Sequence, residues 1–366
     1  MGGTRKQESG KSVRTGSPRR TLLSDVAQAA GVSIATASRA LSGANGVSEE
    51  RRDRIRRIAD ELHYEHDPIG QSLRSGKTNL IGVWVESITN ASSGRLVAAL
   101  TNALHAHGYD ILVTEYSDDP AEDASRIRSL ARRRPDYMVV LHPRRPEVFR
   151  DLVDRGHEVV VISSGAPSIW SGPLVSVDSA PSRRELARHL VELGHRKALI
   201  LQPGRRIGRP GTDALRRAAS RAKLPLEVEL APYAPGEAGP GLTTAQVVER
   251  INADDGPTFL HVNEAQAPAL LKGLRDAGMR IPQDVSVMST GAPSWAEIFQ
   301  PPLSVTDVDY YLCGVRAAEI IVELARGEEP RRRTVRGAYI RRESVGPAPA
   351  RSATSTKRTK RAKAAS

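Results

Sequence analysis

The chain has 366 residues, with 54 Lys and Arg against 42 Asp and Glu, which gives a formal net charge of +12. This length predicts two or three domains with hydrophobic cores of their own and excludes a mini-protein that depends on cross-links. Cys313 is the single cysteine, which excludes an intramolecular disulfide and a thiolate cluster, and no apolar stretch is long enough to span a membrane. We therefore expect a cytoplasmic protein with no membrane contact and no metal site.

The excess positive charge lies at the two ends of the chain. Residues 1–20 hold six basic residues and one acidic residue, and residues 346–366 hold six basic residues and no acidic one. Both segments are rich in Ser, Thr, Gly, Ala and Pro, which bury too little apolar surface to offset the entropy of an ordered chain. We expect two disordered basic tails, whose charge suits a polyanionic partner.

Residues 21–65 have the pattern of three short helices. Between Leu23 and Leu41 the apolar spacing fits two helices that meet at Gly31, where a residue without a side chain permits a tight turn. Ser33 has the position of a helix N-cap, and the third helix starts at Ser48. The residues expected to form the shared apolar face are Val26, Ala30, Val32, Ala37, Ala40, Ile55, Ile58, Ala59 and Leu62. The spacing predicts a helix-turn-helix DNA-binding domain, although the spacing by itself also fits a generic three-helix cap.

From residue 78 to residue 345, short apolar runs alternate with helical patterns. Such runs predict parallel strands that helices bury on both faces of a sheet. The runs are 80–85, 111–116, 137–141, 159–162, 198–201, 259–262 and 285–288. Because the span is long for one sheet, we expect an α/β fold of two doubly wound lobes, with a ligand cleft where the carboxyl ends of their strands face each other.

Several motifs, in their order along the chain, resemble the lactose repressor (LacI) family. They are DVAQAAGVS at 25–33, SRALSG at 38–43, HLVELGHRKALILQPG at 189–204, IPQDVSVM at 281–288 and PPLSVTDVD at 301–309. The resemblance extends from about residue 21 to residue 343 and implies a core like that of the periplasmic binding proteins, over residues 78–345. It also implies a homodimeric transcription regulator, most often a repressor, that binds palindromic double-stranded DNA operators and is associated with the nucleoid.

The resemblance places the second helix in the major groove of the operator. The residues expected to contact DNA are Ser24, Ser33, Ile34, Ala35, Thr36, Ser38, Arg39 and Leu73. Ile34 and Ala35 stand where family members present base-reading side chains, but they form no hydrogen bonds and can contact only thymine methyl groups. Hydrogen-bonded readout therefore depends mainly on Thr36, Ser38 or Arg39, and much of the specificity is expected to come from DNA deformation.

Residues 66–77 correspond to the family's hinge, which folds on the operator. Asp67 suits a helix cap and Pro68 the first helical position, whereas Gly70 costs about 1 kcal/mol of helix propensity relative to Ala. We expect this helix to be stable only with DNA and a partner hinge, where Leu73 would open a base step from the minor groove. The alternative is that Leu73 is an ordinary linker residue.

The resemblance also implies a small effector between the lobes. The residues expected to face it are Asn90, Ser92, Ser93, Ser163, Asn263 and Gly291. The segment after the first strand lacks the family's aromatic platform, Ser163 and Gly291 stand where carboxylates commonly hold sugar hydroxyls, and Gly211 stands where an effector-binding Arg is expected. We therefore expect few charged partners for a hexose and weak binding of simple sugars. Asn263 and Glu264 do match the family's Asn-Asp pair at a strand end. Asn263 fits ligand contact and a strand-end turn equally well, and the identity and the presence of an effector stay open.

No arrangement of residues predicts an enzyme or a bound cofactor. Gly10-Lys11-Ser12 lacks the first glycine and the preceding strand of a phosphate-binding loop, and the paired histidines lack further zinc ligands. His195 is expected to support the turn into the following strand. The alternative to a DNA-binding regulator is a solute-binding protein with an accessory N-terminal domain, since the core fold is shared.

Overall fold

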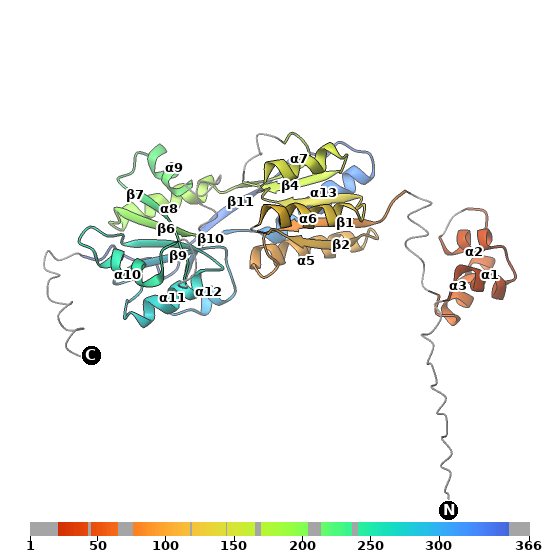
Figure 1. Cartoon of the computed structure of the whole chain (residues 1–366), viewed down its shortest axis with the longest axis horizontal. Helices are drawn as coiled ribbons and strands as arrows, with labels where there is room; N and C mark the ends of the chain where they lie inside the picture. The colour runs from red at the N-terminus through yellow and green to blue at the C-terminus, as the bar shows by residue number, and fades with distance from the viewer. Residues whose placement is uncertain are drawn as a thin grey trace, which may run out of the picture. The chain divides into compact units, whose positions relative to one another are not determined.

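The fold is taken from a computed structural model of the 366-residue chain (Figure 1). It describes residues 21–42, 45–64, 76–117, 119–143, 145–164, 170–203, 214–235 and 241–350. These residues belong to two compact units, one up to Thr78 and one from Asn79 onward. The predicted tail at 1–20 and residues 65–75, which include most of the predicted hinge, lie outside the described residues.

The first unit, called the headpiece below, contains the three predicted helices. They are α1 (Leu23–Ala30), α2 (Ile34–Leu41) and α3 (Glu49–Glu61). α1 ends because Gly31 adopts a left-handed backbone conformation, with a φ of 66°, which a residue without a Cβ takes up without a clash. α2 is capped by Ser33, whose Oγ accepts a hydrogen bond from the backbone N–H of Thr36.

The core of the headpiece is small and consists largely of alanine. Its buried residues are Val26, Ala27, Ala30, Ala37, Ala40, Ile55 and Ala59. Small side chains on α1 and α2 allow the helices to cross closely, and Thr21 Oγ1 donates to the Leu62 carbonyl at 2.9 Å, which links the two ends of the unit. The prediction that Leu62 belongs to the core is wrong, because it follows the last turn of α3 and is 36% exposed.

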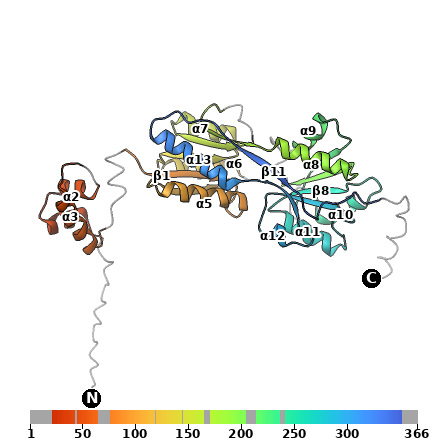
Figure 2. The same cartoon turned by 180° about the vertical axis from the view of Figure 1, so that it is seen from behind.

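The second unit consists of two α/β lobes with the predicted alternation of strands and helices (Figure 2). The first lobe contains β1 (Leu80–Val85), α5 (Ala91–His105), β2 (Asp110–Glu115), α6 (Pro120–Ala131), β3 (Tyr137–Leu141), α7 (Pro146–Asp154), β4 (Val159–Ser163), β5 (Leu174–Asp178) and α13 (Tyr310–Ala325). The second contains α8 (Ala180–Glu192), β6 (Lys197–Gln202), α9 (Ala214–Arg221), β7 (Glu227–Pro232), α10 (Thr244–Asn252), β8 (Phe259–Asn263), α11 (Ala267–Asp276), β9 (Ser286–Thr290), α12 (Trp295–Ile298) and β10 (Ser304–Val308).

A single strand, β11 (Arg333–Ile340), connects the sheets of the two lobes. The described strands have the order β2-β1-β3-β4-β5-β11-β10-β9-β8-β6-β7. Residues 333–336 of β11 pair in parallel with β5, and residues 337–340 pair antiparallel with β10. At the change of partner stands Gly337, where a Cβ would lie 3.1 Å from Ser179 Oγ. The two lobes are therefore joined by backbone hydrogen bonds as well as by the chain.

Helices cover both faces of each sheet, as predicted for a doubly wound fold. In the first lobe Val83 and Val139 pack toward α5 and α13, whereas Trp84 and Met138 pack toward α6 and α7. In the second lobe α10, α11 and α12 cover one face, and α8 and α9 cover the other. Because both faces are filled, a ligand can approach these sheets only at the strand ends.

The apolar runs predict seven of the eleven described strands. They miss β5, β7, β10 and β11. β7 and β11 alternate buried and exposed residues, and β5 and β10 contain Ser, Asp or Thr, so none of the four forms a continuous apolar run.

The described part of the second unit extends to residue 350, five residues beyond the predicted end of the core at residue 345. The Gly346 N–H donates to Ser286 Oγ at 3.1 Å, and the Gly346 carbonyl accepts from the buried His195 Nε2 at 3.0 Å. The Ala348 N–H donates to the Leu193 carbonyl at 2.8 Å. The predicted boundary is corrected accordingly, because these backbone groups are bonded to the second lobe, and His195 has a structural role there. Residues 351–366 lie outside the described residues.

Candidate functional site

α2 presents one side of its surface away from the headpiece core. Ala37 and Ala40 are buried, whereas Ile34 is 55% exposed. The exposed residues expected to contact DNA are Ser24, Ser33, Ile34, Ala35 and Arg39, and the half-buried ones are Thr36 and Ser38. Apart from Ser24, which lies on α1, these residues belong to α2 or its cap. The expected contact residues are therefore accessible in one small region.

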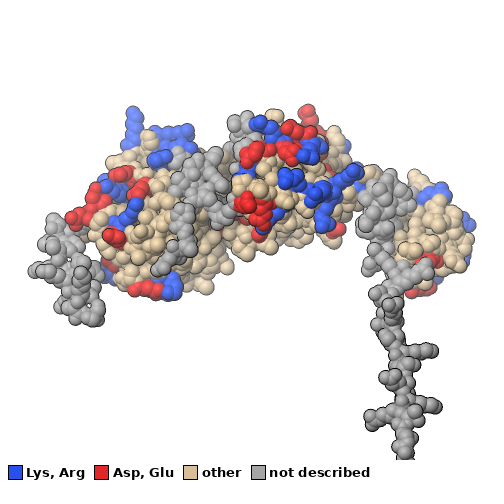
Figure 3. All heavy atoms as spheres, in the orientation of Figure 1, with Lys and Arg blue, Asp and Glu red and all other residues tan. Residues whose placement is uncertain are grey.

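Polar groups on α2 also bond within the helix. Ser33 Oγ lies 2.9 Å from Thr36 Oγ1, and Arg39 Nε donates to the Ala35 carbonyl at 3.3 Å. The Arg39 side chain therefore lies along the exposed side of α2, toward the N-terminal end that enters the major groove in helix-turn-helix proteins. Basic side chains are also visible elsewhere on the headpiece surface (Figure 3). Leu73 lies outside the described residues, and so does Gly211.

A cleft of about 550 Å³ lies between the two lobes of the second unit. Its walls are formed by residues at or directly after the carboxyl ends of strands. They include Glu86, Ser87 and Asn90 after β1, Glu115 and Tyr116 at β2, His142 after β3, Arg183 after β5, Asn263 and Glu264 at β8, Thr290 and Gly291 at β9, and Asp307 and Tyr310 around the end of β10. This arrangement is the one predicted from the alternation of strands and helices.

Two polar contacts connect the lobes across the cleft. Ser92 Oγ, in the first turn of α5, donates to Glu264 Oε1 at 3.0 Å. One turn further along α5, Arg95 Nη2 forms an ion pair with Asp307 Oδ1 at 3.0 Å. Since α5 belongs to the first lobe and Glu264 to the second, a change in the angle between the lobes must change the contact between Ser92 and Glu264.

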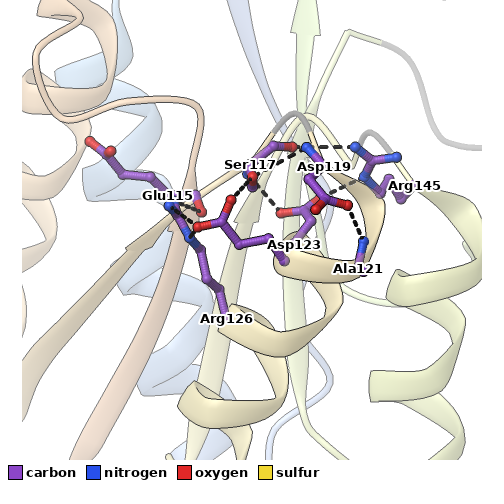
Figure 4. A network of polar contacts seen from close by, with 8 residues as sticks. Glu115, Ser117, Asp119, Ala121, Asp123, Arg126 and Arg145 are labelled. Carbon is purple, nitrogen blue, oxygen red and sulfur yellow. Dashed lines mark hydrogen bonds and ion pairs between the residues drawn. The ribbon is translucent and has the colours of Figure 1, made fainter.

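A buried ion pair fixes the loop that follows β2 (Figure 4). Asp123 is fully buried, and its Oδ2 accepts from Arg145 Nε at 2.7 Å. Asp123 Oδ1 accepts from the Ser117 N–H at 3.0 Å, and Arg145 Nη2 donates to the Ser117 carbonyl at 3.3 Å. Because a buried carboxylate that loses its partners is strongly destabilising, these bonds hold Ser117 beside the first turn of α6. Ser117 directly follows Glu115 and Tyr116, which line the cleft.

The cleft contains more carboxylates than the sequence analysis leads one to expect. Those that line it are Glu86, Glu115, Glu264 and Asp307. Gly291 brings no carboxylate, but a Cβ on Gly291 would overlap Glu264 Oε2, so the carboxylate of Glu264 fills the space beside this glycine. The expectation of few charged partners is therefore wrong. The expectation rested on Ser163 and Gly291, whereas Glu264, which matches the family's pair at a strand end, supplies a carboxylate beside Gly291.

Two histidines, His142 in the wall of the cleft and His261 on β8, are neutral at pH 7. Burial, followed by the positive charge of Arg183, lowers the pKa of His142 to about 4 and that of His261 to about 4. His142 Nε2 shares a hydrogen bond with the Tyr310 hydroxyl at 3.0 Å, and His261 Nε2 shares one with Thr290 Oγ1 at 2.7 Å. His142 therefore offers the cleft a neutral hydrogen-bonding group, and Arg183 supplies positive charge at the cleft.

Most residues expected to face an effector do line the cleft. These are Asn90, Ser92, Ser93, Asn263 and Gly291. Ser163 is not among the lining residues: β4 extends one residue further than predicted and includes Ser163, so Ser164 is the residue that reaches the cleft. Asn263 also closes a turn, because its Oδ1 accepts from the Gln266 N–H at 2.9 Å. Both interpretations of Asn263 are therefore compatible with its position.

Sequence patterns did not indicate His142, Arg183 or Tyr310. Arg183 and Tyr310 lie in the first turns of the helices that follow β5 and β10. These two strands contain polar residues and were not predicted, so the residues at their ends were not predicted either. His142 follows a predicted strand directly, and its place at a strand end is the signal that could have indicated it. Among the described residues, no group of three His, Cys, Asp or Glu side chains could hold a metal ion, and no helix there is long and apolar enough to cross a membrane.

Three protein families match the chain, and two of the matches overlap at residues 187–223. Residues 22–67 match the bacterial regulatory proteins of the lacI family, and residues 78–223 match the periplasmic binding proteins and sugar binding domain of the LacI family. Residues 187–345 match the periplasmic binding protein-like domain. The chain belongs to the LacI family.

Two LacI-type regulators and one solved structure match this chain over most of its length. The HTH-type transcriptional repressor PurR of Vibrio atlanticus is 25% identical over 317 residues, which are 85% of this chain and 94% of PurR. Catabolite control protein A of Staphylococcus xylosus is 23% identical over 308 residues, 83% of this chain and 92% of that protein. The structure of the Lac repressor dimer bound to operator and the anti-inducer ONPF covers 90% of this chain and 100% of its own, with a TM-score of 0.76 and 20% identity, and so has the same fold.

Proposed function

We propose that this LacI-family protein is a sequence-specific transcription regulator, a homodimer that represses genes by binding palindromic operators. The observation that carries the proposal is the surface of α2, where a helix capped by Ser33 exposes Ile34, Ala35 and Arg39 on the side away from its buried alanines. A short helix with such a surface fits the major groove of DNA. The operator complex of the Lac repressor, whose fold this chain shares, supports the same assignment.

The individual residues have different parts in the proposed complex. Thr36, Ser38 and Arg39 supply hydrogen bonds to base edges or phosphates, and Ile34 and Ala35 contact thymine methyl groups. Ser24 and Ser33 face the adjoining DNA backbone. In the hinge at 66–77, Leu73 inserts at the centre of the palindrome, beside its counterpart from the second chain. The protein then works in the cytoplasm, on the nucleoid, because its operators lie there.

We assign the sensor role to the cleft between the lobes. The bond between Ser92 and Glu264 crosses it, so a ligand that competes for either side chain shifts the balance between two lobe angles. The Arg95–Asp307 ion pair lies one turn further along the same helix and responds to the same movement. The proposed function is therefore regulation by binding, without an enzymatic step.

Selection of binding sites from a pool of random duplexes tests the proposal. The full-length chain is expected to recover one common inverted repeat, bound by two chains per duplex. A chain that begins at residue 78 keeps the two lobes and lacks the headpiece, so it should recover no motif. If the full-length chain enriches no common sequence, the proposal fails, and a solute-binding protein with an accessory N-terminal domain becomes the better account.

A further inference from the structure

The charges that line the cleft are unequal. Four carboxylates line it, and they are Glu86, Glu115, Glu264 and Asp307. Arg95 pairs with Asp307, and Arg183 is the one basic side chain among the described lining residues. The neutral state of His142 adds no positive charge at pH 7. Four carboxylates thus face two arginine side chains, so negative charge is in excess in the described part of the cleft.

Among these carboxylates, Glu264 has an oxygen atom that can accept a hydrogen bond from a bound ligand. Its Oε1 accepts from Ser92 Oγ, whereas its Oε2 is buried with no hydrogen-bond partner among the described residues. Gly291 lies beside Oε2 with a φ of +84°, and any side chain there would displace the carboxylate. A buried carboxylate oxygen without a donor is unfavourable, so the site is stabilised when a donor from outside the described chain reaches it.

Ser93 provides a second observation that points to a ligand. It lines the cleft, is 1% exposed, and its Oγ has no hydrogen-bond partner among the described residues. A serine inside a helix commonly bonds to a carbonyl of the preceding turn, and Ser93 does not. Two neighbouring polar groups, from α5 in one lobe and from the end of β8 in the other, thus lack partners in the same cleft.

We propose that the cleft binds a small organic cation that carries hydroxyl groups, and that Glu264 selects its ammonium group. An ammonium group offers three donors and a charge, which a partly buried carboxylate binds more strongly than it binds a neutral hydroxyl. Asn90, Ser93 and Thr290, which line the same space, suit the hydroxyl groups. A metal cation is not the occupant indicated by the described residues, since no three of their ligating side chains converge. The inference rests on the proposed sensor role of the cleft and names its ligand class.

Matched pairs of probes test the proposal with the full-length protein. The pairs are glucosamine with glucose, serinol with glycerol, and ethanolamine with ethylene glycol, each amine beside a neutral molecule of similar size. At least one amine is expected to raise the melting temperature and to give saturable binding by calorimetry, while its neutral partner at the same concentration does neither. If no amine of the three binds, or if the neutral partner binds equally well, the proposal is wrong.

Three variants locate the effect. Glu264→Gln keeps the size of the side chain and can still accept from Ser92, so the loss of charge alone should weaken binding of the amine by about tenfold or more. Ser93→Ala should weaken it by a smaller factor, and Glu249→Gln, which changes an exposed carboxylate on α10, should leave it unchanged. Undiminished binding by Glu264→Gln would overturn the assignment. These measurements contain no DNA, and binding-site selection with the same preparation shows separately whether the proposed function holds.

Discussion

Arg39 has the longest side chain on the exposed side of α2. It is exposed, and its Nε bond to the Ala35 carbonyl adds little to the headpiece core. Arg39→Ala should therefore weaken operator binding by about 1–3 kcal/mol and leave the melting temperature nearly unchanged. Arg54→Ala on α3 is the matched control and should have a smaller effect. Equal operator affinity of the Arg39 variant and the natural protein, measured by fluorescence anisotropy, would refute the proposed docking of α2.

His142 predicts a pH dependence of stability. Burial and Arg183 lower its folded-state pKa to about 4, below the value of 6.5 for an unperturbed histidine. Between these two values the unfolded chain binds a proton that the folded chain does not, so the free energy of unfolding falls as the pH falls from 6.5 toward 4 and is fully retained above 6.5.

His142→Gln should make this dependence shallower. Chemical denaturation at pH 7 and pH 5 measures the loss of unfolding free energy, which should be smaller in the variant than in the natural protein. Exposed His107 supplies the control, and His107→Gln should leave the loss unchanged. An equal loss in all three proteins would show that His142 is not one of the groups responsible.

At the scale of elements, the contact between α5 and α13 depends on a glycine. A Cβ on Gly314 would lie 2.7 Å from Ala99 Cβ and 2.7 Å from the Leu96 carbonyl oxygen. Gly314→Ala should therefore lower the free energy of unfolding by about 1–3 kcal/mol through overpacking. In α5, Gly94→Ala is the control, because its Cβ would meet the Ile88 carbonyl oxygen at an ordinary 3.6 Å. A Gly314 variant as stable as the natural protein in urea would contradict the close packing of these helices.

The hinge carries a prediction from the sequence alone. If Leu73 opens the central base step, Leu73→Ala should weaken specific binding and reduce DNA bending, with little change in the melting temperature of the free protein. Circular-permutation gel shifts measure the bend. A bend of undiminished size would leave Leu73 as an ordinary linker residue.

The elements that could be predicted are those with continuous apolar runs or clear caps. β1 and β3 match their predicted ranges, and Gly31 and Ser33 mark the turn between α1 and α2. β5, β7, β10 and β11 could not be predicted in this way, because polar residues interrupt their apolar runs, whether these residues are exposed or, like Ser176 and Ser304, buried. Residue patterns also leave the order of strands undetermined.

The same limit applies to the cleft. Asn263 pairs in register with Thr290, which brings Glu264 beside Gly291, although 27 positions separate them in the sequence. Strand register is a long-range property set by packing, so the carboxylate beside Gly291 could be found only in the structure. Asn90, Ser92 and Ser93 could be indicated because they stand where the LacI family has a cleft loop after its first strand, although their residue types depart from the family's pattern.

At the scale of the whole molecule, two deletions at the C-terminal end distinguish the effect of the basic charge on DNA binding from the effect of the chain end on stability. Removing residues 351–366 takes away six basic residues, so it should lower nonspecific DNA affinity and flatten its salt dependence without altering operator preference or the melting temperature. Removing residues 346–366 should also lower the melting temperature, because Gly346 and Ala348 lose their bonds to Ser286, His195 and Leu193. An altered preference among operators after the shorter deletion would mean that the tail contributes to sequence recognition.

The central claim is that two copies of this chain recognise one palindromic DNA sequence through α2. The most direct measurement is a titration of the full-length protein, at one fixed salt concentration, against the selected inverted repeat and a scrambled duplex of the same composition. We predict two chains per repeat and an affinity at least about a thousandfold higher than for the scrambled duplex. Equal affinities for the two duplexes, or one chain per repeat, would contradict the account.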